Sequence, residues 1–191
     1  EEETPSYISY TKKGGFHLEL KRKNLFAWAE DAVYRYDDFT LEAHVRFAPQ
    51  NGHSASGFIL RCLDESNFYY FLISNKKRFR FDLVLNNHPL PLIEWTESSY
   101  INSEQNTLRI IAHMDHFSFY CDDEWLAEVN EESLRYGRIA FAGQNYDEQN
   151  KARFTLQRFL INSKPLDVER DYYRWVKHIP INPDSRIHLA E

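Results

Sequence analysis

The sequence predicts an all-β protein, a single antiparallel β-sandwich followed by a helical extension. Aromatic residues are abundant, with 14 Phe, 12 Tyr and 4 Trp against one Met, and aromatic side chains favour strands. Short alternating runs recur between turn signals from residue 7 to about residue 162, and no helical period of useful length precedes residue 165. A chain of 191 residues suits one domain of ordinary size with an appendage.

The expected strands are bounded by polar turns. "FTLEAHVRF" alternates strictly, and the turn "LDESN" separates "SGFILRC" from "FYYFLIS". A second turn, "NKK", leads into "RFRFDLVL". In chain order, the segments expected as strands are 39–47, 56–62, 68–74, 78–85, 107–113, 117–121, 125–129, 137–143 and 152–161.

We expect three regions along the chain: a disordered or linker segment over 1–6, the sandwich over 7–164, and a helical connector over 165–191. Asp167 is a plausible N-cap for a helix over 166–179, and Asn182 with Pro183 begins a second helix. The apolar positions at helical spacing are Val168, Tyr172, Trp175 or Val176, Ile179, Ile187, Leu189 and Ala190. The stripe of the second helix is incomplete at Glu191, so we expect a helical-repeat domain to follow.

Charge, apolar content and cysteine count limit the kinds of partner and location that we expect for this protein. The net charge of -6 argues against a nucleic-acid partner, which needs a basic surface. No apolar run reaches the length of a transmembrane segment. The acidic start "EEETPSY" fits a mature exported protein or an excised fragment, and we favour a periplasmic or cell-surface location over a cytoplasmic one. Cys62 and Cys121 are too few for a disulfide scaffold, and each also fits as a small buried residue.

The stretch "HMDHFSFYCDDEWLAEV" (113–129) raises the question of a metal site, because it holds two His, a Cys and several acids. Alternation instead predicts a three-stranded meander with turns at 113–116 and 122–124 and with Cys121 pointing into the core. The two turns then lie at opposite ends of a strand, roughly 17 Å apart, whereas metal ligands must converge on one point. We therefore expect no metal ligands and no cofactor here.

Residues 14 to 162 resemble a laminin-G/concanavalin-A-like jelly roll. The resemblance rests on "DFTLEAHVRF", "SGFILRCLDESNFYYFLIS" and "FYCDDEWLAEV" followed by "ESLRYGRIAFAG". This stretch is similar to a domain family of unknown function that includes 3-keto-disaccharide hydrolases and glucanase-like lectin domains. The implied fold is an antiparallel concanavalin A-like jelly roll with an exposed concave sheet face. The last residues, "IPINPDSRIHLAE", resemble the opening of a tetratricopeptide repeat.

Catalytic machinery is not evident in the sequence. Related jelly-roll glucanases carry a Glu-x-Asp-x-x-Glu strand that places its carboxylates on one face. The nearest match, "ERDYYR" (169–174), ends in Arg and falls in the expected helix. There is no Gly-x-Ser-x-Gly elbow and no phosphate-binding Gly loop. We assign no catalytic residue.

A ligand-binding face follows from pairing the strands around "LDESN" and "NKK". We expect Arg61 opposite Tyr70 and Cys62 opposite Tyr69. A three-residue loop with a bulge then places Tyr70 opposite Asp82, because a one-residue shift would bury Arg80 and Asp82. The apolar face then holds Phe58, Leu60, Cys62, Tyr69, Phe71, Ile73, Phe79, Phe81 and Leu83. The opposite, exposed face holds Arg61, Tyr70, Arg78, Arg80 and Asp82.

Arg forks and Tyr rings suit sugar hydroxyls or carboxylates, although the same residues would also form a solvated face with cross-strand ion pairs. In the resembling family, an Arg in a G-x-x-x-R strand lines the concave face, and Arg61 of "GFILR" occupies that position. We therefore expect Arg61→Ala to weaken glycan binding with little change in melting temperature.

Three functions remain open. The first is a non-catalytic module that recognises a carbohydrate or a protein partner through the concave face, as part of a larger scaffold. The alternative is a glycoside-processing hydrolase of the glucanase-like class. The third is a structural domain that positions its C-terminal neighbour.

Overall fold

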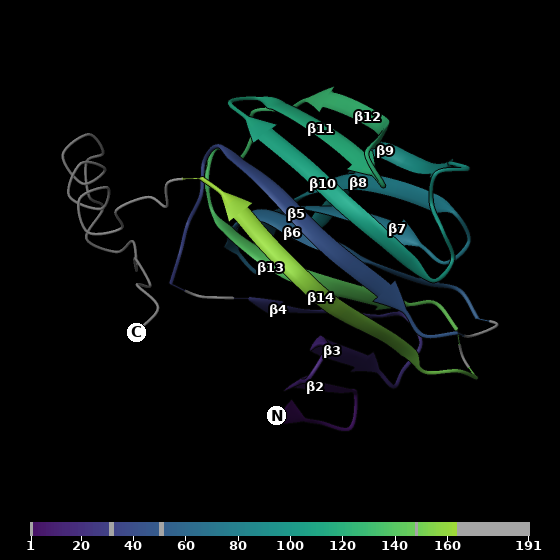
Figure 1. The fold of residues 1–191 in the computed structure, drawn as a ribbon. Helices are drawn as coiled ribbons and strands as arrows, with labels where there is room; N and C mark the ends of the chain where they lie inside the picture. The colour runs from purple at the N-terminus through teal and green to yellow at the C-terminus, as the bar shows by residue number, and fades with distance from the viewer. Residues whose placement is uncertain (1, 31–32, 50–51, 148, 164–191) are drawn as a thin grey trace, which may run out of the picture.

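The computed structural model of the protein describes residues 2–30, 33–49, 52–147 and 149–163 (Figure 1). The helix expected over 166–179 and the repeat expected after it lie outside the described residues. The described chain forms two packed antiparallel sheets with no helix, which confirms the all-β jelly-roll sandwich. None of the described segments is a helix long and apolar enough to cross a membrane.

The larger sheet has eight strands and the smaller sheet has six. The eight-stranded sheet runs in the order β1 (Glu2–Glu3), β2 (Tyr7–Lys12), β3 (Gly15–Leu20), β14 (Ala152–Asn162), β5 (Phe39–Phe47), β10 (Gln105–His113), β11 (His116–Cys121) and β12 (Glu124–Asn130). The six-stranded sheet runs in the order β4 (Leu25–Glu30), β13 (Arg138–Asn145), β6 (Ser54–Asp64), β7 (Asn67–Ser74), β8 (Arg78–Leu85) and β9 (His88–Glu97). Figure 1 shows β14, β5 and β10 in front of β13, β6 and β7.

The core between the sheets follows from alternation. In β5 every second residue from Phe39 to Phe47 is buried, and the intervening residues are partly or fully exposed. Phe71 of the six-stranded sheet stacks on Phe119 of the eight-stranded sheet with ring centroids 4.3 Å apart. Phe81 packs on the same ring at 4.7 Å. Aromatic pairs therefore join the two layers across the core.

The meander expected from "HMDHFSFYCDDEWLAEV" is confirmed as β10, β11 and β12. Ile110 pairs with Phe119, which in turn pairs with Ala127. Cys121 is buried in the core, as expected. The acidic turn is one residue shorter than expected: Asp122 and Asp123 have φ of 49° and 67°, while Glu124 already belongs to β12. Within the described residues, no group of three or more His, Cys, Asp or Glu is placed to hold a metal ion.

The N-terminal residues correct one expectation. Residues 1–6 were expected to be disordered or linker, but Glu2–Glu3 forms β1 and pairs with Ile8 and Ser9 of β2. The turn between these strands is held by Thr4, whose hydroxyl accepts a hydrogen bond from the backbone N–H of Tyr7 at 3.0 Å. A Thr side chain that bonds the nearby backbone stabilises such a turn, and the sandwich therefore includes the strand Glu2–Glu3.

Candidate functional site on the outer face of the six-stranded sheet

The outer face of the six-stranded sheet, which faces away from the core, forms a second hydrophobic cluster. β7 directs Tyr69, Phe71 and Ile73 into the core, so Phe68, Tyr70 and Leu72 point outward. We call this surface the aromatic face. Its partly or fully buried ring side chains are Phe26, Trp28, His53, Phe68, Tyr70, Trp95 and Tyr146.

The hairpin between β7 and β8 has the expected register. Tyr70 pairs with Asp82, and Ile73 pairs with Phe79. The three-residue loop ends at Lys77, whose φ of 58° is the left-handed conformation of a bulged loop. This register directs Arg80 and Asp82 outward, next to Tyr70, and keeps Phe79 and Phe81 in the core.

A hydrogen-bonded network joins these three polar side chains. The carboxylate of Asp82 is fully buried and accepts a bond from Arg80 Nε to Oδ1 at 2.8 Å. Arg80 Nη2 donates to Asp82 Oδ2, and the Tyr70 hydroxyl donates to the same oxygen at 2.7 Å. Burial and the bond to Asp82 raise the pKa of Tyr70 far above its ordinary value. The Arg80 side chain, 20% exposed, is therefore held in one orientation by a bidentate pair.

Two groups of rings flank Arg80. On one side Phe26, Trp28, Phe68 and Tyr70 pack with neighbouring centroids 5.4 to 6.5 Å apart. On the other side His53 stacks on Tyr146 at 4.5 Å and lies 5.9 Å from Trp95. The guanidinium carbon of Arg80 lies 5.7 Å from the Tyr70 ring and 5.3 Å from the Trp95 ring. Arg80 therefore links the two groups through cation–π contacts.

Tyr146 places a further hydroxyl beside Arg80. This hydroxyl donates to Gln144 Oε1 at 2.7 Å. Burial raises the pKa of Tyr146 to about 12, although the nearby Arg80 acts in the opposite direction. The phenol is therefore protonated at neutral pH and can donate and accept hydrogen bonds.

Arg78 lies at the rim of this face. Its Nη2 bonds Glu97 Oε1 at 2.8 Å, and both side chains are well exposed, at 45% and 76%. Such an ion pair contributes little to stability.

Arg61 does not lie on this face, which corrects the prediction that placed it there. Its φ of 48° belongs to a β-bulge between Leu60 and Asp64, and the bulge turns the side chain away from the face. Arg61 is fully buried, with its guanidinium 4.8 Å from the Phe117 ring centroid. It donates to the carbonyl of Asp37 from Nε at 3.1 Å and Nη2 at 2.9 Å, and to the carbonyl of Leu134 from Nη1 at 3.1 Å.

The same bulge changes the position of Cys62. We expected Cys62 opposite Tyr69 in the core, but Tyr69 pairs with Leu60, and Cys62 joins the outer cluster. Both Cys62 and Cys121 are free and buried. They lie in different hydrophobic clusters.

Sequence reasoning missed most of the rings on the aromatic face. Phe26 and Trp28 lie on β4, and Trp95 lies on β9, neither of which was expected as a strand. "LFAWAE" is almost wholly apolar, and Pro89 and Pro91 interrupt the alternation of β9. Edge strands tolerate proline, so "HPLPLIEW" could have been read as an edge strand.

Comparison with known proteins identifies a sequence relative and solved structures of similar fold. No family model matches the sequence. The chain is 29% identical over 227 aligned residues to a TPR repeat-containing protein of Treponema pallidum (strain Nichols); the match covers 93% of this chain and 28% of that protein. The chain thus spans well under half of that relative's length.

Solved structures with similar folds include proteins that act on or bind carbohydrates. The carbohydrate-binding module CBM66 from Bacillus subtilis has a TM-score of 0.69 at 16% identity, over 83% of this chain and 92% of the module. A β-glucanase from Bacillus licheniformis has a TM-score of 0.55 at 13% identity, over 81% of each chain. Sheep galectin-11 has a TM-score of 0.52 at 3% identity, over 73% of this chain and 98% of the galectin. These structural similarities confirm that this chain has the jelly-roll architecture that is also found in the carbohydrate-binding module and the glucanase.

Proposed function

We propose that this chain is a non-catalytic carbohydrate-recognition module that binds a polysaccharide on the aromatic face. The observation that carries the proposal is the Arg80–Asp82–Tyr70 network held between two groups of aromatic rings. Binding sites for small molecules combine ring surfaces with a few fixed polar groups in this way.

Each part of the face has a role in sugar recognition. The rings of Trp95 and Tyr146 supply apolar surface for the C–H faces of a sugar, and Arg80 and the Tyr146 hydroxyl supply hydrogen bonds for its hydroxyl groups. Asp82 holds the Arg80 fork before a ligand arrives, so little side-chain freedom is lost on binding.

The contacts of the acidic side chains on the aromatic face favour binding over hydrolysis. A retaining glycosidase needs two carboxyl groups about 5–5.5 Å apart, one as nucleophile and one as acid. On the aromatic face, both oxygens of Asp82 accept hydrogen bonds, and the Glu30 carboxylate lies 3.3 Å from Arg138 Nε. Both carboxylates are thus engaged by arginine side chains, and these contacts support a structural role for them on the face better than the role of nucleophile or acid.

The module belongs, in this proposal, to a longer scaffold. The Treponema pallidum relative is described as a TPR repeat-containing protein, and the match covers 28% of it. Residues 165–191, which end in a repeat-like sequence, would connect the sandwich to such repeats. A native gene that stops within a few residues of Glu191, or that continues into another β-rich domain, would contradict this part.

Polysaccharide binding can be tested with two tryptophan variants. Affinity electrophoresis in gels containing neutral glucans, fructans, xylans or uronic-acid polymers would identify a ligand, and calorimetry would give its affinity. We expect Trp95→Ala to weaken binding by at least about tenfold, because a ring contact is lost. The matched control is Trp125→Ala, because Trp125 lies on β12 of the other sheet and is 54% exposed.

Three other results would contradict the proposal. Binding to none of the polymers would favour a protein partner for this face. An equal loss in both variants would show that the aromatic face is not the site. Release of reducing sugars would favour the hydrolase alternative.

A further inference from the structure

The six-stranded sheet ends at an edge strand without the usual protection. Among the described strands, β4 pairs only with β13, so alternate backbone N–H and C=O groups of β4 point away from the sheet. Its sequence, Leu-Phe-Ala-Trp-Ala-Glu, has five apolar residues in succession and neither Lys nor Pro. The opposite edge, β9, contains Pro89 and Pro91, which block further pairing.

A groove runs beside β4 because the two sheets differ in width. The eight-stranded sheet continues through β2 and β1, and residues of β2 line a groove of about 510 Å³ together with β4. Tyr7 and Ser9 form one wall of this groove, and Leu25, Ala27 and Ala29 form the other. One further strand beside β4 would pack its inward-facing side chains against this wall of β2.

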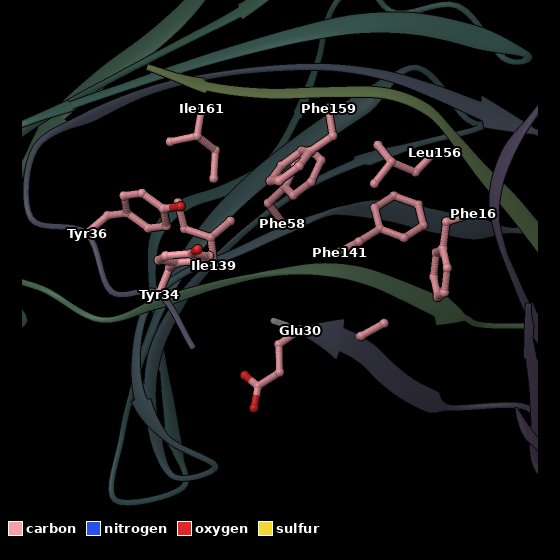
Figure 2. A pocket seen from close by; sticks show the side chains of 11 residues that line it. Phe16, Glu30, Tyr34, Tyr36, Phe58, Ile139, Phe141, Leu156, Phe159 and Ile161 are labelled. Carbon is pink, nitrogen blue, oxygen red and sulfur yellow. The ribbon is translucent and has the colours of Figure 1, made fainter. Parts of the chain in front are cut away.

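The groove continues into an apolar end pocket of about 280 Å³, since Ala29 and Glu30 line both. Figure 2 shows Phe58 and Phe159 together in this pocket, with Tyr34 and Tyr36 to one side and Glu30 below. The Phe159 ring stacks on Phe58 at 5.6 Å, yet Phe159 is 41% exposed and Tyr34 is 49% exposed. This pocket can take one aliphatic or aromatic side chain.

The charges along the groove and end pocket are all negative. The ionisable acids and bases lining them are Glu2 and Glu30, with no Lys or Arg among the described lining residues. Glu30 also contacts Arg138, at 3.3 Å. A second copy of the chain would bring the same two carboxylates to the interface and would also place its own β1 and β2 where those of the first copy lie. A strand with a basic residue is therefore the better match.

We propose that the β4 edge binds an extended segment of a partner protein, which adds one strand to the six-stranded sheet. The segment has alternating apolar residues, places one of them in the end pocket, and carries a Lys or Arg toward Glu2 or Glu30. Backbone hydrogen bonds provide affinity in this mode, and the side-chain pockets provide specificity. The groove shares Phe26 and Trp28 with the aromatic face, but pairing with the β4 backbone and filling of the end pocket do not depend on sugar binding around Arg80.

The first experiment selects peptides against the full chain from a displayed library of random peptides, each roughly ten residues long to span one strand. We expect selected peptides to alternate apolar residues and to contain a basic residue. Their affinity should fall at least about tenfold for Ala29→Lys, which places a long cation where the groove and end pocket meet, and for the surface variant Tyr34→Ala. Equal affinity for wild type and both variants, or a library without binders, would overturn the proposal. Unchanged melting temperature shows that each variant folds.

The second experiment tests strand addition itself. One selected peptide is made with N-methyl groups on alternate amides, in two versions that differ by one residue in phase. We expect one version to lose binding and the other to keep it, because only one set of amides faces β4. Equal binding of both versions would show that side chains alone carry the contact.

Hydrogen exchange identifies the occupant of the groove. We expect amides of 25–30 to exchange faster than those of the central strand β6 in the free chain, and to be protected when the peptide is added. Protection in the free chain at all concentrations would assign the groove to the chain's own C-terminal region. Protection that grows with protein concentration would assign it to a second copy. Either result would overturn the proposal.

Discussion

Arg61 and Arg80 lie in the same six-stranded sheet, on β6 and β8, and occupy opposite kinds of surroundings. The Arg61 side chain is fully buried and donates to main-chain carbonyls of Asp37 and Leu134. The Arg80 side chain is 20% exposed and is held by the side chains around it on the outer face. Local sequence does not distinguish the two, since each arginine lies within a strand between two apolar neighbours.

The partners of each arginine indicate its role. Arg61 joins the segment before β5 to the segment before β13, because Asp37 and Leu134 precede those strands. The Leu134 carbonyl is buried in a connection without a strand partner, so it needs a side-chain donor. Arg80 instead has partners on an open face lined with rings, where a ligand can reach it. We infer that Arg61 stabilises the fold and that Arg80 serves recognition.

The largest effect is expected from Arg61→Ala, and it reverses the expectation drawn from the sequence. The change removes the donor to the buried Leu134 carbonyl and the two donors to the Asp37 carbonyl, and it opens a cavity beside Phe117. We expect the free energy of unfolding to fall by about 3–5 kcal/mol, measured by urea denaturation. Arg61→Lys should lose less, because it keeps the charge and part of the volume. Polysaccharide affinity of the folded fraction should not change, and a selective loss of affinity would contradict the assignment.

The next largest effect is expected from Asp82→Ala. It leaves the Tyr70 hydroxyl and the partly buried Arg80 without their acceptor. We expect a loss of roughly 2–4 kcal/mol in the free energy of unfolding, together with weaker polysaccharide binding, because Arg80 is no longer oriented. The control is Glu97→Ala in the exposed pair with Arg78, which should cost at most about 1 kcal/mol. Equal losses of unfolding free energy in the two variants would show that Asp82 contributes no more to stability than an exposed ion pair does.

A smaller, pH-dependent effect is expected from His53 on the aromatic face. Burial lowers the pKa of His53 from 6.5, and the positive charges of Lys76 and Arg78 lower it further. The unfolded chain therefore binds a proton at a higher pH than the folded chain, so stability is full above about pH 6.5 and falls as the pH drops below it. Burial and the positive charge of Lys12 also lower the pKa of His17, so His17 contributes to the loss of stability at low pH in the same way.

Thermal melting across roughly pH 5 to pH 8 checks this expectation. The decline in melting temperature on the acidic side should be shallower in His53→Gln than in wild type. An unchanged profile would mean that His53 is protonated as easily in the folded chain as in the unfolded one.

The smallest effect concerns the turn that sets the direction of Arg80. Lys77 has a φ of 58°, which an L-residue with a side chain adopts at a cost. We expect Lys77→Gly to raise the free energy of unfolding by about 0.5–1 kcal/mol, by relieving that strain. Lys76→Gly, at a position without positive φ, should give no gain. Denaturation curves of the two variants check the bulged register on which Arg80 depends.

The sequence by itself determined the sandwich, the meander and the register of β7 with β8. These depend on a two-residue period and on short turns, so the information lies within about twenty residues of each element. Tyr70, Arg80 and Asp82 were placed together for this reason, because one hairpin carries all three.

Only the tertiary structure decided the direction of Arg61 and the assembly of the aromatic face. The bulge after Leu60 exists because Arg61 finds carbonyl partners in Asp37 and Leu134, far away along the chain. Trp28, Trp95 and Tyr146 are distant in sequence and lie on one face because the strand order β4-β13-β6-β7-β8-β9 brings their segments into the same sheet. Strand order is set by contacts distant in sequence, and a local pattern carries no record of it.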